Sequence, residues 1–396
     1  MQKVIFLVDM NAFFISCEVL RNQNLQNRPA AVAGNPKKRT GIILTANYEA
    51  RKYGVKTTMT INQALKLCPH LILVPPDHHF YRKKSQEVID LLYNYTPKLQ
   101  KSSIDEAWLD MTGTQCLFGP PIKVAKKIME DIKSNLGLWC SIGISENKFL
   151  AKMASEIKKP MGITELWQKD IQSKMWPLPI KAMYGIGEKT ANKLQNLGIT
   201  TIGQLATMDQ MALYHRFGKY GLEIHQHANG IDFSPIEQNS LEDIKSISRS
   251  ITLPMDITDI EKLKYVLMEL SEEIGRTARK YNKKGYTVHV VIKFSDFTTM
   301  NRQTTLPPTY YTKDIFEAGY RLLEESFSLP KSVRLIGISL KNFQDTQAFE
   351  QVSFFSMAKE KDHKHRKIDK VMDEIRNKYG SEKISRASLM KNNHFK

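Results

Sequence analysis

The chain has 396 residues, 41% hydrophobic and 25% charged, which is typical of a soluble globular protein with roughly two to four domains. Lys and Arg total 58 against 41 Asp and Glu, and the net charge of +17 favours a polyanionic partner, with nucleic acid ahead of an anionic membrane surface. No run approaches the roughly 18 consecutive apolar residues of a membrane span. We therefore expect no membrane-spanning segment.

The cysteines and the N-terminus indicate a cytoplasmic protein. MQKVIFLVD is too short for the apolar region of a signal peptide and has no small-residue cleavage site. The four cysteines form no close pair and are mostly flanked by apolar residues, which predicts reduced thiols in the core. They are Cys17, Cys68, Cys116 and Cys140.

The first predicted elements are a strand and a helix with an acidic residue between them. KVIFLVD (3–9) is an apolar strand, and NAFFISCEVL (11–20) has apolar positions at helical spacing. A strand that ends in Asp9 and leads into a helix is a common architecture for a site. ANYEARKYG (46–54) and TINQALKLCP (60–69) predict two further short helices.

Two adjacent acids, Asp105 and Glu106, stand inside SSIDEAWLD after a predicted amphipathic helix over 80–95. On a regular strand, neighbouring side chains point to opposite faces, so one carboxylate would be buried at a cost of several kcal/mol. We therefore place both acids at the tip of a hairpin between 96–103 and 107–111. There they are either ordinary surface residues or ligands that converge on a cation.

A helix over 121–137 and a strand over 139–145 complete the first region. Strand, helix, hairpin, helix and strand together predict an α+β layer, with helices on one face of a mainly antiparallel sheet. Asp9 ends one strand of this layer, and the hairpin acids belong to the same layer. The three carboxylates are therefore expected to meet.

From about 166 to 233 the sequence predicts short helices, with YGIG as the clearest turn. Gly185-Ile186-Gly187 between two helices matches a helix-hairpin-helix, whose glycines let backbone N–H groups approach a phosphate at a helix N-terminus. With Lys189 just after it, such a turn would bind DNA without reading its sequence. The alternative is an ordinary helix turn with capping glycines.

Two further groups of residues are candidates for phosphate contacts. Lys148 and Lys152 lie one helical turn apart in SENKFLAKMASEIKKP, although a solvated helix face is the simpler interpretation of such charges. Tyr48 and Arg51 share a helix face, and an arginine can bind a phosphate in bidentate fashion.

The C-terminal third predicts a separate small α/β domain. After a polar linker at 234–246, alternating segments at 247–253, 285–294 and 333–340 bracket two amphipathic helices. The tail at 346–396 is polar and basic. Within it lies an apolar helical stripe that we expect to pack on the protein or on a partner: Ile368, Val371, Met372, Ile375 and Tyr379.

Taken together, these features predict phosphoryl-transfer chemistry on a nucleic acid. Three carboxylates can hold divalent cations, and separate basic groups can bind a polyphosphate. Two metal ions about 4 Å apart activate an attacking hydroxyl and stabilise the leaving oxygen of an in-line displacement.

Five motifs occur in the order found in Y-family DNA polymerases: VDMNAFF, ANYEARKYGV, SIDEAWLD, SIGISENKFLAKMASEIKKP and YGIG. The resemblance extends to about residue 345 and is greatest to the bacterial DNA polymerase IV type. The NAF-x-x-SCE segment is instead similar to the DNA polymerase V catalytic subunit, and Asn11 stands where the family often has a second Asp. The branch is therefore less firmly indicated than the family.

The resemblance implies an α+β right-hand polymerase with a small α/β little-finger domain. By the order of motifs, the domains are the palm (1–10 and 75–165), fingers (11–74), thumb with helix-hairpin-helix (166–233), linker (234–246), little finger (247–345) and basic tail (346–396).

The resemblance also implies roles for individual residues. Asp9, Asp105 and Glu106 would be catalytic and hold two Mg²⁺ ions, with the Met10 carbonyl as a further ligand. Phe14 would be the steric gate against a ribose 2′-OH, whereas its sequence context alone indicates a core residue. The predicted triphosphate ligands are Thr45, Tyr48, Arg51 and Lys159, and the predicted DNA contacts are Gly185, Ile186, Gly187, Lys189, Lys148 and Lys152.

The implied activity is template-directed translesion synthesis from dNTPs on primer-template DNA, with low fidelity, no proofreading and a monomeric enzyme. QVSFF (351–355) resembles peptides that dock on the bacterial sliding clamp, through Gln351, Phe354 and Phe355. The main alternative is a non-catalytic DNA-binding repair adaptor on the same fold. A nucleotide cyclase on a related palm would not explain YGIG or the basic C-terminal third.

Overall fold

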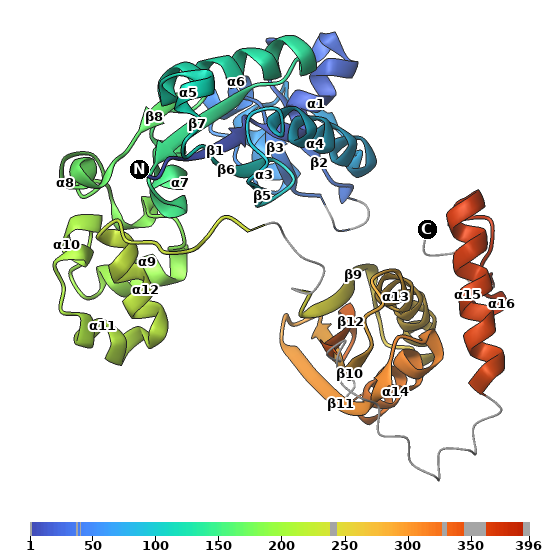
Figure 1. Cartoon of the computed structure of the whole chain (residues 1–396). Coiled ribbons are helices and arrows are strands. Elements are labelled where there is room, and N and C mark those ends of the chain that lie inside the picture. Colours follow the sequence, from blue (N-terminus) through green and yellow to red (C-terminus); the bar gives the residue numbers. More distant parts are fainter. Residues whose placement is uncertain are drawn as a thin grey trace. The chain divides into compact units, whose positions relative to one another are not determined.

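The computed structural model describes residues 2–36, 39, 41–237, 244–326, 331–343 and 362–390 (Figure 1). The chain divides into two compact units. The first comprises Met1–Gly34 and Ile42–Asn239, and the second comprises Asn35–Gly41 and Ser240–Lys396. In the described ranges, every helix is too short or too polar to cross a membrane.

A five-stranded sheet forms the centre of the first unit. Its neighbours are antiparallel except β7 and β8, which run parallel, so the mainly antiparallel sheet predicted from the sequence is confirmed. The order is β5 (Leu99–Lys101), β6 (Glu106–Asp110), β1 (Ile5–Met10), β7 (Cys140–Ser145) and β8 (Ile163–Glu165). The α-helices of this unit are α1 (Phe13–Arg21), α2 (Tyr48–Lys52), α3 (Ile61–Leu67), α4 (His78–Leu92), α5 (Gln115–Phe118), α6 (Pro121–Leu136), α7 (Lys148–Ile157), α8 (Ile171–Lys174), α9 (Glu188–Gln195), α10 (Ile202–Ala206), α11 (Gln210–Phe217) and α12 (Lys219–Ala228).

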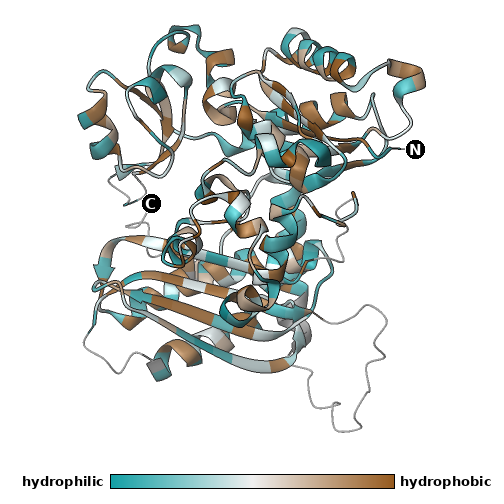
Figure 2. Ribbon diagram, turned by 90° about the vertical axis from the view of Figure 1, so that its left-hand side faces the viewer, coloured by the Kyte–Doolittle hydropathy of each residue, from teal (hydrophilic) through white to brown (hydrophobic). Residues whose placement is uncertain are grey.

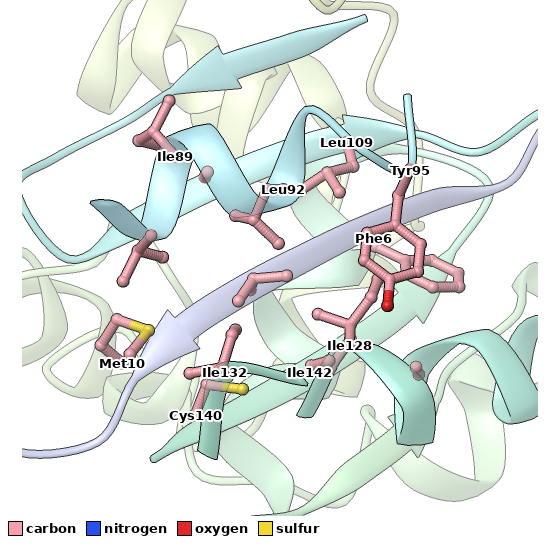
Figure 3. Packing of buried hydrophobic residues seen from close by; sticks show 14 of the residues in the cluster. Phe6, Met10, Ile89, Leu92, Tyr95, Leu109, Ile128, Ile132, Cys140 and Ile142 are labelled. Carbon is pink, nitrogen blue, oxygen red and sulfur yellow. The ribbon is translucent and has the colours of Figure 1, made fainter. Parts of the chain in front are cut away.

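The central strand β1 is buried on both faces. Phe6, Val8 and Met10 belong to a core that includes residues of α4 and α6, and Figure 3 shows Phe6 and Met10 within this core. Ile5 and Leu7 pack on the opposite face with Ala151 of α7. Because α7 covers that second face, the predicted layer with helices on one face only is wrong.

The turn between β1 and α1 and a small second sheet lie beside this layer. Ala12 caps α1 with a left-handed backbone (φ 47°), which reverses the chain sharply after the strand. The second sheet has the order β3 (Ile43–Ala46), β2 (Ala30–Ala33), β4 (Ile72–Val74). Asn47 ties it to α2, because its side-chain oxygen accepts the N–H groups of Ala30 and Ala50 at 3.0 and 2.9 Å.

The short helices α8 to α12 share an apolar core with one another and with residues of α7. That core includes Met175, Leu194, Leu205 and Ile224. The helical texture predicted for 166–233 is therefore present. Three of the four cysteines, Cys17, Cys68 and Cys140, are buried free thiols as predicted, but Cys116 is an exposed free thiol.

The second unit contains a four-stranded antiparallel sheet, and Figure 2 shows hydrophobic residues gathered along its strands. Its elements are β9 (Ser246–Ile257), α13 (Ile260–Lys280), β10 (Gly285–Phe294), β11 (Thr299–Thr309), α14 (Thr312–Ser326) and β12 (Val333–Phe343), in the sheet order β11, β10, β12, β9. The three predicted strands correspond to β9, β10 and β12. β11 was not predicted, because its sequence TMNRQTTLPPT is polar and ends in prolines that only an edge strand tolerates.

A C-terminal helix, α15 (Asp362–Tyr379), belongs to the second unit together with the short α16 (Ala387–Met390). Its contacts with α13 include the ion pairs of Arg279 with Asp369 and Asp373 and of Arg376 with Glu272. In the predicted apolar stripe Met372 is buried, but Val371 and Tyr379 are 50% and 60% exposed. The stripe is therefore only in part a packing face.

Candidate active site

Asp9 and Glu106 face each other across neighbouring strands. They are direct partners in the antiparallel register of β1 and β6. Asp9 is only 5% exposed, and Glu106 opens β6 immediately after the hairpin turn. Opposed positions on antiparallel strands place their Cβ atoms about 5 Å apart, so the two carboxylates are close enough to bind one cation.

Asp105 lies in the hairpin turn, just outside the strand, as the sequence predicts. Its carbonyl oxygen accepts the Met10 N–H at 2.9 Å, and its carboxylate accepts the Ser103 hydroxyl at 2.5 Å. Over the described ranges, no group of three or more His, Cys, Asp or Glu side chains is arranged to hold a metal ion. The structure therefore brings together two of the three predicted carboxylates, and the third is turned to Ser103.

Lys152 completes this cluster and corrects a prediction from the sequence. Its ammonium nitrogen lies 2.9 Å from Asp9 Oδ2, 2.7 Å from Glu106 Oε1 and 2.8 Å from Glu156 Oε1. Lys152 is 7% exposed, so neither a solvated helix face nor a surface contact with DNA describes it. The residue lies on the buried side of α7, which packs against β1.

Lys159 and Glu156 enclose the cluster from the end of α7. Lys159 Nζ is 2.8 Å from Asp9 Oδ2 and 2.8 Å from Glu156 Oε1. Sequence reasoning missed Glu156 entirely. The signal that could have found it is its spacing, because Glu156 follows Lys152 at i+4 on α7 and precedes Lys159 by three residues.

Burial and neighbouring charges pull the pKa values of the cluster apart. Burial raises the pKa of Glu106 to about 7, and the Asp9 carboxylate adds to this rise. Burial also raises the pKa of Asp9, but the ammonium groups of Lys152 and Lys159 outweigh it and hold that pKa below its ordinary value. Burial lowers the pKa of Lys152, but Asp9 and Glu106 outweigh it and raise the value well above the ordinary one.

The predicted triphosphate residues lie on the second sheet and on α2. Thr45 is in β3, and Tyr48 and Arg51 are in α2, where the Arg51 guanidinium carbon lies 4.8 Å from the Tyr48 ring centroid. Burial raises the pKa of Tyr48, and the charges of Lys159 and Asp9 also act on it. The α2 face is therefore electrostatically coupled to the carboxylate cluster.

Phe14 lies in the first turn of α1 and is half-buried. Its ring stacks on Tyr81 of α4 with 4.4 Å between ring centroids and 13° between planes. Tyr81 is fully buried, and its hydroxyl donates to Glu18 at 2.6 Å. This stacking, worth about 0.5–1.5 kcal/mol beyond burial, fixes the orientation of the Phe14 ring.

The YGIG turn has the predicted backbone but one unexpected contact. Gly185 has φ +90°, and Gly187 caps the N-terminus of α9. Ile186 is 6% exposed, and its N–H donates to the Met183 carbonyl at 3.0 Å. The contact of Ile186 with DNA stays a prediction, and the exposed Lys189 keeps an accessible charge beside the helix start.

Lys148 is the other lysine of the predicted basic pair. Its ammonium donates to Gln100 Oε1 at 3.1 Å and to the Pro235 carbonyl at 2.8 Å, and it lies 5.1 Å from the Trp108 ring centroid. Lys148 and Lys152 therefore have different environments although they are one turn apart.

Asn11, the departure from the family pattern, has a structural role. It is 3% exposed, its Nδ2 donates to Ser141 Oγ at 3.0 Å, and its Oδ1 accepts the Met161 N–H at 2.8 Å. It thus joins the end of β1 to β7 and to the loop after α7. Its amide belongs to this contact and not to the carboxylate cluster.

The donor atoms around Asp9 suit a hard divalent cation. Carboxylate oxygens and backbone carbonyls are the ligands that Mg²⁺ prefers, and Met10 places a carbonyl next in the chain to Asp9. In this structure the ammonium groups of Lys152 and Lys159 provide the positive charge. The residues therefore fit the predicted metal ions in chemical type.

Comparisons with known proteins agree with the motif order. Residues 8–156 match the impB/mucB/samB family, residues 244–354 match the C-terminal domain of that family, and residues 169–199 match its HHH motif. A protein of Alkaliphilus oremlandii named DNA polymerase IV is 59% identical over 98% of this chain and 100% of its own length. A DNA polymerase IV of Clostridium kluyveri is 57% identical over 99% of each chain.

Solved structures give the same result for the fold. A Y-family DNA polymerase chimera superposes with a TM-score of 0.77 at 27% identity, covering 86% of this chain and 99% of its own. A Dbh ternary complex superposes with a TM-score of 0.60 at 26% identity, covering 86% and 100%. Together with relatives that are more than half identical over their full length, these likenesses show that the chain belongs to the Y family of DNA polymerases, among the proteins named DNA polymerase IV.

Proposed function

We propose that this DNA polymerase adds dNMP units from dNTPs to a primer 3′-OH at the Asp9–Glu106 pair, with two Mg²⁺ ions held by Asp9, Met10, Asp105 and Glu106. The observation that carries this assignment is the cross-strand pairing of Asp9 with Glu106, with Asp105 bonded to the Met10 backbone. Asp105 would join the ligands by leaving its bond to Ser103.

The residues around this pair have roles that suit a triphosphate. Bound divalent cations would supply positive charge to the attacking and leaving oxygens. Thr45, Tyr48 and Arg51 offer hydroxyl and guanidinium donors, and Lys159 places an ammonium group beside Asp9. Phosphoryl transfer depends mainly on such positioning of charge.

Phe14 is proposed as the steric gate that selects deoxyribonucleotides. Its stacking on Tyr81 supports this role, because a ring fixed in orientation can exclude a 2′-OH. Replacing Phe14 by Ala should admit ribonucleotides, and unchanged sugar selectivity in a primer-extension assay would rule out the gate.

The finer assignments of partners also remain proposals. Gly185, Gly187, Lys189 and Lys148 are proposed to contact DNA phosphates, and the enzyme is proposed to act as a monomer in the cytoplasm. The proposed clamp-binding residues, Gln351, Phe354 and Phe355, lie outside the described residues. The test for the clamp is its stimulation of synthesis, which changing both phenylalanines to Ala should abolish.

The carboxylate assignment is tested by primer extension on undamaged template with Mg²⁺ and dNTPs. Asp105→Asn combined with Glu106→Gln should abolish extension while the variant still binds primer-template DNA. Undiminished extension would mean that the chemistry lies elsewhere. The non-catalytic adaptor, which no observation favours, predicts that the unchanged protein also fails to extend.

A further inference from the structure

The cation nearest to both paired carboxylates belongs to the protein itself. Lys152 Nζ is 2.9 Å from Asp9 and 2.7 Å from Glu106. These are two of the three side chains to which the proposed function assigns metal ions. Lys152 and a divalent cation therefore require the same oxygen atoms.

The cluster needs this positive charge when no metal ion is bound. The side chains of Asp9 and Glu106 are 6% and 20% exposed, so water screens their mutual repulsion poorly. An ammonium group between two buried carboxylates offsets both the repulsion and the cost of burying them. Lys152 is itself buried, so these carboxylates are also what makes its own burial tolerable.

We propose that Lys152 is a positioning residue, which holds Asp9 and Glu106 together in the metal-free enzyme and competes with the first divalent cation for them. The inference rests on the proposed function, because it takes Asp9 and Glu106 as metal ligands. It assigns to Lys152 a role in setting metal affinity instead of the DNA contact expected from the sequence.

Glu156 gives the displaced ammonium group an alternative partner. Its Oε1 is 2.8 Å from Lys152 and 2.8 Å from Lys159, and its side chain is 46% exposed. When a cation takes Asp9 and Glu106, Lys152 keeps its bond to Glu156 and is not left buried without a partner. Glu156 therefore lowers the cost of releasing the metal ligands.

The test is Mn²⁺ binding to the full-length protein without DNA, followed by electron paramagnetic resonance. Lys152→Met should bind Mn²⁺ about tenfold more tightly than the unchanged protein, because the competing charge is gone. Lys148→Met, one turn earlier on α7 and bonded to Gln100 and Pro235, is the matched control and should leave the affinity unchanged. Unchanged or weaker binding by Lys152→Met would overturn the proposal.

Glu156→Gln should have the opposite effect and weaken Mn²⁺ binding several-fold. The change in net charge alone would also make Lys152→Met bind Mn²⁺ more tightly and Glu156→Gln bind it more weakly, but these two effects would then add up in the double variant. If Glu156 acts by holding Lys152, its effect should largely disappear in the Lys152→Met background. Full additivity in the double variant would overturn this part of the proposal. Lys152→Arg covers the case in which the Met variant does not fold, because it keeps the charge and should bind Mn²⁺ no more tightly than the unchanged protein.

One further variant distinguishes failure of the proposed metal site from failure of the proposed role of Lys152. Asp9→Asn with Glu106→Gln should lose Mn²⁺ binding if these residues are metal ligands. If this variant still binds Mn²⁺ normally, the proposed metal site fails. If it loses binding while Lys152→Met behaves like the unchanged protein, only the role of Lys152 fails.

Discussion

A cluster of buried charge lies in each compact unit, and the two clusters use different cations. In the first unit, lysines meet Asp9 and Glu106. In the second unit, arginines of α13, α15 and the segment after it meet carboxylates of α13 and α15. The pairs are Arg279 with Asp369 and Asp373, Arg376 with Glu272, and Arg386 with Glu272 and Asp369.

The type of cation influences how readily a buried carboxylate can exchange its partner. Arg279 binds Asp373 in bidentate fashion, at 2.6 and 3.2 Å, in the fork geometry that fixes two planar groups together. Lys152 is a point charge with freely rotating donors, and a metal ion can replace it. The arginine cluster is therefore a stable set of ion pairs that holds α15. In the lysine cluster, a metal ion can replace the ammonium group.

The first prediction compares primer extension after the replacement of Asp9 and of Asp369, two aspartates that are both almost fully buried. Asp9→Asn should lower primer extension by about a thousandfold or more, because it removes a charge needed at the reacting phosphate. Asp369→Asn, 3% exposed in the native protein, should leave extension on a short duplex nearly unchanged. Single-nucleotide incorporation assays measure both, and comparable losses in the two variants would contradict the division into exchangeable and permanent clusters.

The second prediction concerns Arg279. Arg279→Met leaves Asp373 without its arginine and Asp369 with Arg386 as its remaining arginine, which should cost about 3 kcal/mol in the docking of α15. Hydrogen exchange should then show loss of protection across α15. Arg276→Met is the control, since that arginine is half-buried and donates to the Asn377 amide of α15 rather than to a carboxylate. Full protection of α15 in Arg279→Met would show that the apolar contacts suffice.

The sequence predicted those parts of the active site that depend on local pattern, but not those that depend on contacts between residues far apart in the chain. The placement of Asp9 at a strand end and of Glu106 at a hairpin follows from local pattern, and the structure confirms both. The burial of Lys152 does not, because Lys148, Lys152 and Glu156 lie on the polar face of α7, which the sequence pattern assigns to solvent, whereas the structure buries the helix continuously over 149–155. That burial depends on the approach of α7 to β7, where a Cβ at Gly143 would lie 1.9 Å from the Ala151 carbonyl.

The second unit shows a similar division. Three of its strands follow from alternation, whereas β11 is polar and its pairing with β10 depends on tertiary contacts. The ion pairs that hold α15 also could not be predicted from the sequence pattern. The apolar stripe of this helix gave no sign of the role of Asp369, which is held by Arg279, 90 residues earlier in the chain.

The third prediction is a pH dependence that the exchangeable cluster should have. Because the pKa of Glu106 is raised to about 7, a metal ion must displace a proton from it at lower pH. Mn²⁺ affinity should fall about tenfold for each pH unit below 7 and level off above it. In the metal-free protein the same group favours folding at low pH, and that contribution is lost as the pH rises from 4.5 through 7.

Mn²⁺ titrations at several pH values measure this dependence, with Glu106→Gln as the comparison. The variant has no proton to release at this position, so its residual binding should lack the slope. An affinity that does not change between pH 5.5 and 7 in the unchanged protein would contradict the raised pKa.

The last prediction tests the bidentate bond between Arg279 and Asp373. Arg279→Lys keeps the charge near Asp369 but loses the bidentate bond to Asp373, which should cost about 1 kcal/mol, well below the cost of Arg279→Met. Hydrogen exchange across α15 measures the difference, with Arg276→Lys as the control. If Arg279→Lys were as damaging as Arg279→Met, charge alone would contribute little. If it had no effect, a lysine would fasten α15 as well as an arginine, and the contrast between the two clusters would rest on burial rather than on the choice of cation.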